Sequence, residues 1–141
     1  MGEDRLSKLV LEQRNITQLM ENVYNEIITL QNSVEERRRA LQFLEMFSEL
    51  NKDLEVLFPI GGGLYLKANI PNQKSIFSNV GGQIFLDKEI EEVIPQIKTS
   101  LEKLNKLLEE RRQLLNSLKT RYDEISAELT EIYFKASGRK K

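Results

Sequence analysis

Very few side chains in this sequence belong to the types that carry out covalent or acid–base chemistry. The chain has 141 residues and contains no Cys and no His. Without thiols and imidazoles, disulfides, most zinc sites, Ser-His-Asp triads and imidazole acid–base catalysis are excluded. The sequence therefore predicts a protein that is not an enzyme and that needs no metal and no cofactor.

Three other groups of residues could bind or react, and each has a plainer interpretation. The triple glycine at 61–63 could cradle a phosphate, but that requires a helix N-terminus directly after it, and a strand-like segment follows instead. The neighbouring carboxylates at 91–92 and at 109–110 point apart on a helix, which favours a solvated face over catalysis. The basic residues 135 and 139–141 favour a solvated tail over a nucleic-acid or chaperonin contact.

The overall charge and hydropathy also limit the possible partners. The sequence has 21 Lys and Arg against 22 Asp and Glu, a net charge of −1. Because the positive and negative charges nearly balance, the protein has no strong electrostatic field that would attract nucleic acid or an anionic membrane. No apolar run approaches the ~20 residues that cross a bilayer, and residues 1–4 do not resemble a secretion signal. We expect a cytoplasmic protein that binds neither nucleic acid nor membrane.

Two long heptad repeats must position whatever binding residues the chain has. Their a and d positions are apolar apart from Gln13, Arg37 and Arg111. This spacing predicts two coiled-coil helices, and their similar length suggests an antiparallel hairpin within one unit, 1–141. The predicted elements are a helix over 5–55, a central segment over 56–87, a second helix over 88–136 and a basic tail over 137–141.

Some details of the helices remain open. Asp87 is the expected N-cap of the second helix. Pro95 lies either in a first turn that begins near 94 or at a kink in a helix that begins near 88. The two arginines at d positions either extend past the seam to pair with surface Glu, which we favour, or mark a softened stretch where the helices splay.

The central segment alternates like strands and is punctuated by glycines. The pattern predicts two β-hairpins, over 56–70 and 75–87, so the fold class is α+β and mainly α. Such small hairpins leave apolar faces exposed, and we expect other subunits to cover them. The expected oligomerisation residues are Phe58, Ile60, Leu64, Tyr65, Leu66, Ala68, Ile70, Ile76, Phe77, Val80, Ile84, Phe85 and Leu86. The expected turn glycines are Gly61, Gly62, Gly63, Gly81 and Gly82.

The order of these elements and two central motifs resemble the alpha class of the prefoldin family. The motifs are Phe58-Pro59-Ile60-Gly61-Gly62-Gly63-Leu64-Tyr65-Leu66-Lys67-Ala68 and Val80-Gly81-Gly82. Two hairpins between the helices point to the alpha class, because beta-class subunits carry one. The chain departs from the family pattern at Leu64, where a small residue is usual, and at Gln83, where a second glycine is usual.

The resemblance implies an ATP-independent holdase. In this family the hairpins assemble into a β-barrel body, typically an α2β4 hexamer with prefoldin beta subunits. Unfolded polypeptide clients are held at the coiled-coil tips and handed to a group II chaperonin. If the chain turns at its centre, the start and the end of the sequence meet. The expected client-binding tip residues are Leu6, Leu9, Val10, Leu129, Ile132, Tyr133 and Phe134.

Two structural proteins would give a similar sequence. One is a coiled-coil spacer or filament-forming scaffold that assembles through the β-hairpins. The other is an ordinary parallel dimeric coiled coil, which the central hairpin segment disfavours because it would interrupt a continuous helix.

Overall fold

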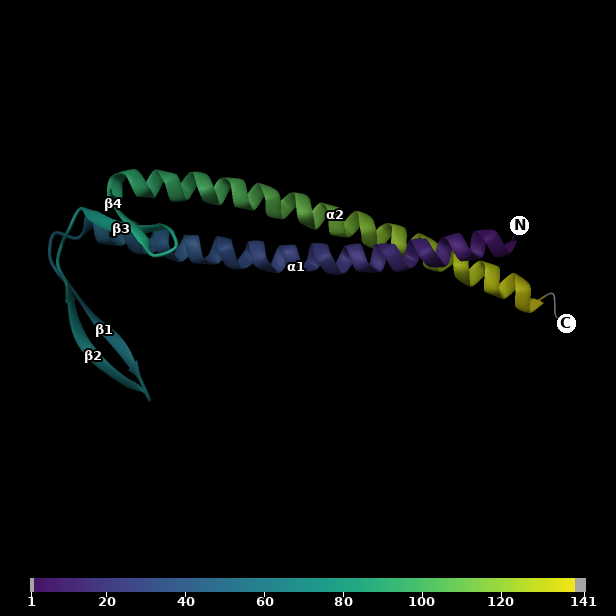
Figure 1. Ribbon diagram of the computed structural model, residues 1–141, viewed down its shortest axis with the longest axis horizontal. Coiled ribbons are helices and arrows are strands. Elements are labelled where there is room, and N and C mark those ends of the chain that lie inside the picture. The colour runs from purple at the N-terminus through teal and green to yellow at the C-terminus, as the bar shows by residue number, and fades with distance from the viewer. Residues whose placement is uncertain (1, 139–141) are drawn as a thin grey trace. The chain divides into compact units, whose positions relative to one another are not determined.

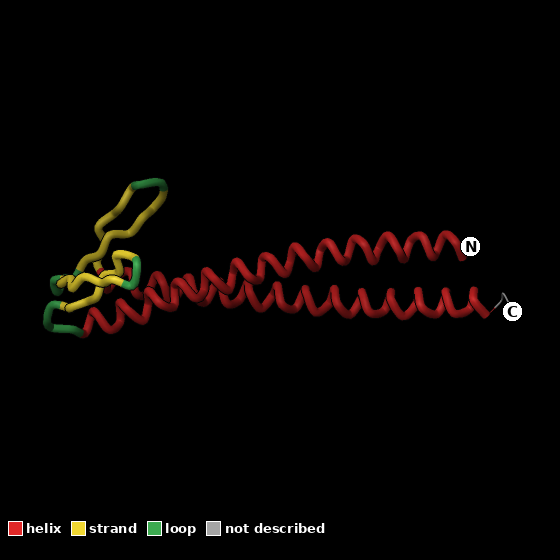
Figure 2. The backbone as a smooth tube through the Cα atoms, turned by 90° about the horizontal axis from the view of Figure 1, so that it is seen from below, coloured by secondary structure: helices red, strands yellow, loops and turns green. Residues whose placement is uncertain are grey.

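The computed structural model describes residues 2–138 as two long helices separated by two β-hairpins (Figures 1 and 2). The elements are α1 (Gly2–Glu49), β1 (Leu54–Gly61), β2 (Leu64–Ile70), β3 (Ser75–Gly81), β4 (Ile84–Glu89) and α2 (Ile90–Gly138). The mainly helical α+β fold class predicted from the sequence is confirmed. Over the described residues, neither helix has a stretch apolar enough to span a membrane.

The internal contacts divide the chain into two compact units. The helical unit contains the residues up to Ser33 and those from Leu104 onward, and the hairpin unit is Val34–Lys103. Both helices contribute to both units, because α1 and α2 each extend past these boundaries. The basic tail residues 139–141 lie outside the described part of the chain.

The helical unit is held together by an apolar seam between antiparallel helices. Arg5 contacts Glu128 and Glu26 contacts Arg111, which shows that early residues of α1 face late residues of α2. Two buried clusters form the core, and every member lies at an a or d position of the predicted heptads. They are Leu9, Ile16, Ile125 and Leu129 in the first cluster, and Val23, Ile27 and Leu108 in the second.

The hairpin unit has a smaller core where the helix ends and the strand ends meet. Its buried residues are Leu44, Phe47, Ile90 and Val93. The rings of Phe43 and Phe47 stack with their centroids 5.6 Å apart, and Phe47 is the more deeply buried of the two. The strand residues Leu54, Ile70 and Ile76 pack against this cluster and attach both hairpins to it.

Each hairpin is a pair of antiparallel strands joined by a two-residue turn. Phe58 faces Leu66 in the first hairpin, and Ser78 faces Leu86 in the second. Gly62 and Gly63 both have positive φ, which a type I′ turn requires and which only glycine adopts easily. In the second turn φ is positive at Gly82 but not at Gln83, so the departure from the family glycine there costs no backbone strain.

The first helix ends earlier than the heptad pattern predicts. We expected the helix to continue to 55, whereas α1 ends at Glu49. Leu54 pairs with Ile70 in the sheet, and the Asp53 carboxylate accepts a hydrogen bond of 2.9 Å from the Asn72 backbone amide. These strand contacts take the segment after 49 out of the helix, although apolar residues continue at three- and four-residue steps through Leu54 and Leu57.

The predicted N-cap of the second helix is wrong. Asp87 lies within β4 and pairs with Phe77, because the strand ladder continues to Glu89. The helix begins at Ile90, whose backbone amide donates a 2.8 Å hydrogen bond to the Lys74 carbonyl oxygen. Pro95 lies inside α2, beyond its first turn, and this excludes the alternative in which the helix begins near 94.

Candidate binding surfaces

Both faces of the hairpins carry apolar side chains that nothing in the chain covers. In the first hairpin, Tyr65 and Leu66 point to opposite faces because they are neighbours on a strand, and they are 60% and 57% exposed. In the second hairpin, Phe85 and Leu86 also point to opposite faces, and they are 58% and 48% exposed. A pair of small sheets with this much exposed apolar surface is incomplete as it stands.

The predicted oligomerisation residues divide into two groups. Most of them are exposed: Phe58, Ile60, Leu64, Tyr65, Leu66, Phe77, Val80, Ile84, Phe85 and Leu86. Ile70 and Ile76 are half-buried and pack on the core of the hairpin unit, and Ala68 is also half-buried. Those three residues therefore have less surface to offer a partner than the sequence pattern suggests.

The predicted tip residues divide in a similar way. Leu9 and Leu129 are buried in the seam, with Leu6 and Ile132 packed against them. The residues that remain open are Val10, Tyr133 and Phe134, and Phe134 is the most exposed large hydrophobic residue among those described, at 79%. The structure brings the predicted set together and leaves these three side chains exposed at one end of the helical unit, which we call the helix-pair end.

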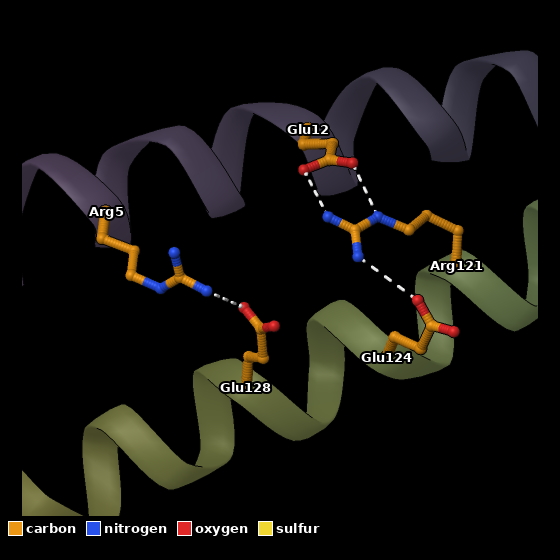
Figure 3. Close-up of polar contacts among 5 residues, drawn as sticks. All are labelled: Arg5, Glu12, Arg121, Glu124 and Glu128. Atoms are coloured by element: carbon orange, nitrogen blue, oxygen red, sulfur yellow. Dashed lines mark hydrogen bonds and ion pairs between the residues drawn. The ribbon is translucent and has the colours of Figure 1, made fainter.

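One flank of the helical unit is lined by ion pairs that sequence reasoning did not identify (Figure 3). Arg121 donates two hydrogen bonds to the Glu12 carboxylate, at 2.8 and 3.0 Å, and a third to Glu124 at 3.3 Å. Arg5 pairs with Glu128 at 3.0 Å. The opposite charges at g positions of two antiparallel repeats are the signal that could have revealed these pairs.

The same contacts shift the ionisation of both partners. Hydrogen bonds donated by Arg121 hold the pKa of the Glu12 carboxyl below its usual value, because they favour the charged form. The hydrogen bonds to Glu12 and Glu124 raise the pKa of Arg121, so it stays protonated at any pH of interest. Both side chains are about 41% exposed, so the pair fixes alignment more than it adds stability.

The polar residues at seam positions also have partners in the helical unit. Arg111 pairs with Glu26 at 3.0 Å, as expected for an arginine that extends past the seam to a surface carboxylate. Gln13 donates a 2.9 Å hydrogen bond to the Ser126 hydroxyl across the two helices. In the hairpin unit, Arg37 is half-buried and lines a surface hollow beside Leu44 and Ile97.

Residues 2–138 contain no group of three or more acidic residues placed to hold a metal ion. The described residues have three candidate binding surfaces, namely the apolar hairpin faces, the apolar helix-pair end and the flank of ion pairs.

Comparison with known proteins identifies the family. The sequence model of the family described as "Prefoldin subunit" matches residues 16–135, which include most of both helices and all four strands. The chain belongs to the prefoldin family. Its curated relatives include several prefoldin alpha subunits, in agreement with the resemblance drawn from the central motifs.

Three matches illustrate the similarity. The prefoldin alpha subunit of Thermofilum pendens is 28% identical over 129 residues, covering 92% of this chain and 99% of the relative. The protein UXT homolog of Dictyostelium discoideum is also 28% identical, with 89% and 86% covered. A solved structure of filamentous prefoldin from Methanocaldococcus jannaschii has the same fold, with a TM-score of 0.63, 22% identity and coverage of 86% and 98%.

Membership in the prefoldin family indicates the kind of role that the chain has. Prefoldins are non-enzymatic chaperones, so the family implies a chaperone role for this chain. Prefoldin subunits also assemble with one another, and the hairpin faces are the part of this chain with the most exposed large apolar side chains among the described residues.

Proposed function

We propose that this chain is a subunit of an ATP-independent holdase that works in the cytoplasm. Its hairpins join those of prefoldin beta subunits in the β-barrel body of an α2β4 hexamer. The ends of its helical unit capture non-native polypeptides, which then pass to a group II chaperonin.

The observation that carries this proposal is the separation of two apolar surfaces. One lies on the hairpins and includes Leu66 and Ile84, and the other lies at the helix-pair end and includes Tyr133 and Phe134. The second surface belongs to the helical unit, and the first to the hairpin unit. A chaperone subunit needs such a division, because the surface used for assembly is not available to a client.

The proposed mechanism of capture is multivalent. Three exposed side chains at one helix-pair end, Val10, Tyr133 and Phe134, give only a weak contact. Several subunits that hold the same client raise its effective concentration at each end, and the combined affinity exceeds that of one contact by orders of magnitude. Release then needs no ATP hydrolysis, because each contact opens on its own and a chaperonin competes for the client.

The experiment that tests the proposal removes the helix-pair end and keeps the hairpins. Deletion of residues 1–10 and 130–141 should abolish suppression of client aggregation, measured by light scattering of denatured citrate synthase. Native mass spectrometry should show an oligomer with the same number of subunits, whose mass is lower only by the mass of the deleted residues. Full suppression by the truncated assembly would refute the proposal.

A double substitution tests the same surface without the loss of helix packing that the truncation could cause. Tyr133→Ser with Phe134→Ser removes two exposed rings and leaves the buried pair Leu9 and Leu129 in place. We expect this variant to suppress aggregation poorly. Leu114→Ser is the matched control, since Leu114 is also exposed but lies away from the helix ends.

A filament-forming scaffold is the second candidate. The solved structure with the same fold is filamentous, and both faces of each hairpin here are open to further subunits. Electron microscopy of the chain alone, and of the chain mixed with a prefoldin beta subunit, distinguishes the filament-forming scaffold from the chaperone hexamer. Long filaments in both samples favour the scaffold, and a closed particle in the mixture favours the chaperone hexamer.

A further inference from the structure

A groove in the helical unit lies on the flank away from the ion pairs. Its half-buried floor consists of Met20, Leu115 and Tyr122, and the exposed ring of Tyr24 forms one wall. The other lining residues are Thr17, Glu21 and Lys119, and the volume is about 500 Å³. That is enough for one or two side chains of another polypeptide and falls within the range of small ligand pockets.

The groove lies where the two buried clusters of the seam meet. Met20 and Tyr122 pack against the first cluster, and Leu115 packs against the second. None of the three is fully buried, so the seam is less tightly closed here than at Ile16 or Val23. Met20 is suited to this place, because its flexible thioether can adapt to different occupants.

The two flanks of the helical unit differ in charge pairing. Within the described residues, the ion pairs that join its helices use the g-position residues Glu12, Glu26 and Glu128. The other flank carries the e positions, where Thr17, Tyr24 and Lys119 line the groove. In an antiparallel pair, e positions face e positions, so the groove lies between Thr17 and Tyr24 of α1 and Lys119 of α2. The g flank has a hollow of about 470 Å³ as well, but its lining includes the ion pair of Glu26 and Arg111.

The same e flank leads to the helix-pair end. Val10 and Tyr133 also occupy e positions and are exposed. Val10 and Tyr24 are two heptads apart, which corresponds to roughly 21 Å along α1. Val10 and Tyr133, two of the three residues proposed as the client contact, therefore lie on the same flank as the groove, with the hydrogen-bonded pair Gln13 and Ser126 between Val10 and the groove.

We propose that this groove is a second client contact, which accepts an aromatic or aliphatic side chain from an extended, uncharged segment of non-native polypeptide. The inference rests on the proposed holdase function and adds an inner site to it. The rim charges, Glu21 and Lys119, are of opposite sign, so the groove offers no net attraction to a charged segment. Its tyrosines and methionine favour apolar and aromatic groups.

Site-specific photo-crosslinking tests the groove in the assembled protein. A p-benzoylphenylalanine replaces Tyr24 in the groove, Phe134 at the helix end, or Leu19 on the ion-paired flank. Leu19 is 50% exposed and Tyr24 is 56% exposed, so the two positions are similarly open to solvent. Each assembly is mixed with denatured citrate synthase and irradiated, and the crosslinked client is quantified.

The outcomes separate the inference from the function on which it rests. Strong labelling at 24 and 134 with little at 19 supports both, and labelling at 24 alone supports the groove and contradicts the tip assignment. Labelling at 134 without 24 overturns the groove and leaves the holdase intact. Labelling at neither overturns both, and labelling at 19 equal to that at 24 overturns the choice of flank.

Substitutions give an independent readout on affinity. Loss of the Tyr24 ring in Tyr24→Ser should weaken binding of the denatured client by about threefold to tenfold, since one apolar contact is removed. Leu19→Ser removes a side chain of similar exposure from the other flank and should change binding less than twofold (about the error of the measurement). Equal effects of the two substitutions would overturn the proposal, provided that circular dichroism shows both variants fully helical.

Discussion

In the helical unit, aliphatic side chains such as Ile125 are completely buried by the other helix of the same chain. In the hairpin unit, residues of the same kind such as Leu66 and Ile84 face outward, at 57% and 64% exposure. The helical unit buries its seam within one chain, whereas these strand side chains stay exposed, which agrees with the proposal that other subunits cover them. Apolar content alone therefore does not say where a core lies, and the spacing of the residues decides it.

The difference also separates two kinds of exposed apolar residue. Those on the hairpins occur on both faces of small sheets, where strand pairing can continue into another subunit. The exposed apolar residues at the helix-pair end are few, and they lie beside a seam whose apolar side chains are already buried between the two helices. The first kind suits permanent assembly and the second suits weak, reversible contact.

The largest expected effect comes from a charge on a hairpin face. Leu66→Asp, or Ile84→Asp in the second hairpin, should break the assembly, because a carboxylate would have to be desolvated in the interface. Native mass spectrometry should show a smaller species with the helices still formed by circular dichroism. Lys67→Ser is the matched control, since Lys67 is exposed and pairs with the exposed Glu55. This variant should form an assembly with the same number of subunits as the unmodified protein.

The next largest effect compares a buried residue with an uncovered one. Ile125→Ala should lower the free energy of unfolding by about 2–5 kcal/mol through the cavity that it leaves. That loss should not vary with protein concentration, because the contacts are within one chain. Leu66→Ala should instead lower the melting temperature most in dilute samples, since Leu66 is exposed in the single chain and its proposed contacts are with other subunits. A concentration-independent effect of Leu66→Ala would contradict the comparison.

The smallest effect concerns pH and the ion-paired flank. The pKa of Glu12 is lowered in the folded state by Arg121, so its contribution is present above the usual pKa of 4.5 and is lost as the pH falls through the lowered value. Thermal melts between about pH 6 and about pH 3 should show a smaller acid-induced loss for Glu12→Gln than for the unmodified protein. Glu21→Gln, on the groove flank, should leave the loss unchanged. An identical pH profile for Glu12→Gln would contradict the role of this pair.

Heptad spacing was sufficient to predict the seam. Buried residues such as Ile16, Val34 and Leu108 are where the repeat places them, because a period of 3.5 residues keeps one stripe of a helix facing its partner. Glycines and alternating apolar residues also sufficed for the two hairpins. These features depend on local pattern alone, and local pattern is what one sequence contains.

Features that depend on competition between elements could not be predicted in the same way. Asp87 suits an N-cap, yet pairing with Phe77 in the strand ladder prevails. The apolar spacing through Leu54 suits a helix, yet pairing with Ile70 prevails. The groove at Met20 and Tyr24 depends on how two buried clusters are spaced along the helix pair, which only the assembled pair of helices defines.

Amide hydrogen exchange of the assembled protein, with and without denatured citrate synthase, tests the division of surfaces most directly. The hairpin strands, 54–61, 64–70, 75–81 and 84–89, should be protected in the assembly before any client is added, and the client should not change that protection. The client should slow exchange near Val10, Tyr24 and Tyr133. If the client instead protected the hairpin strands and left the helix-pair end unchanged, the central claim, that clients and partner subunits use separate surfaces, would be wrong.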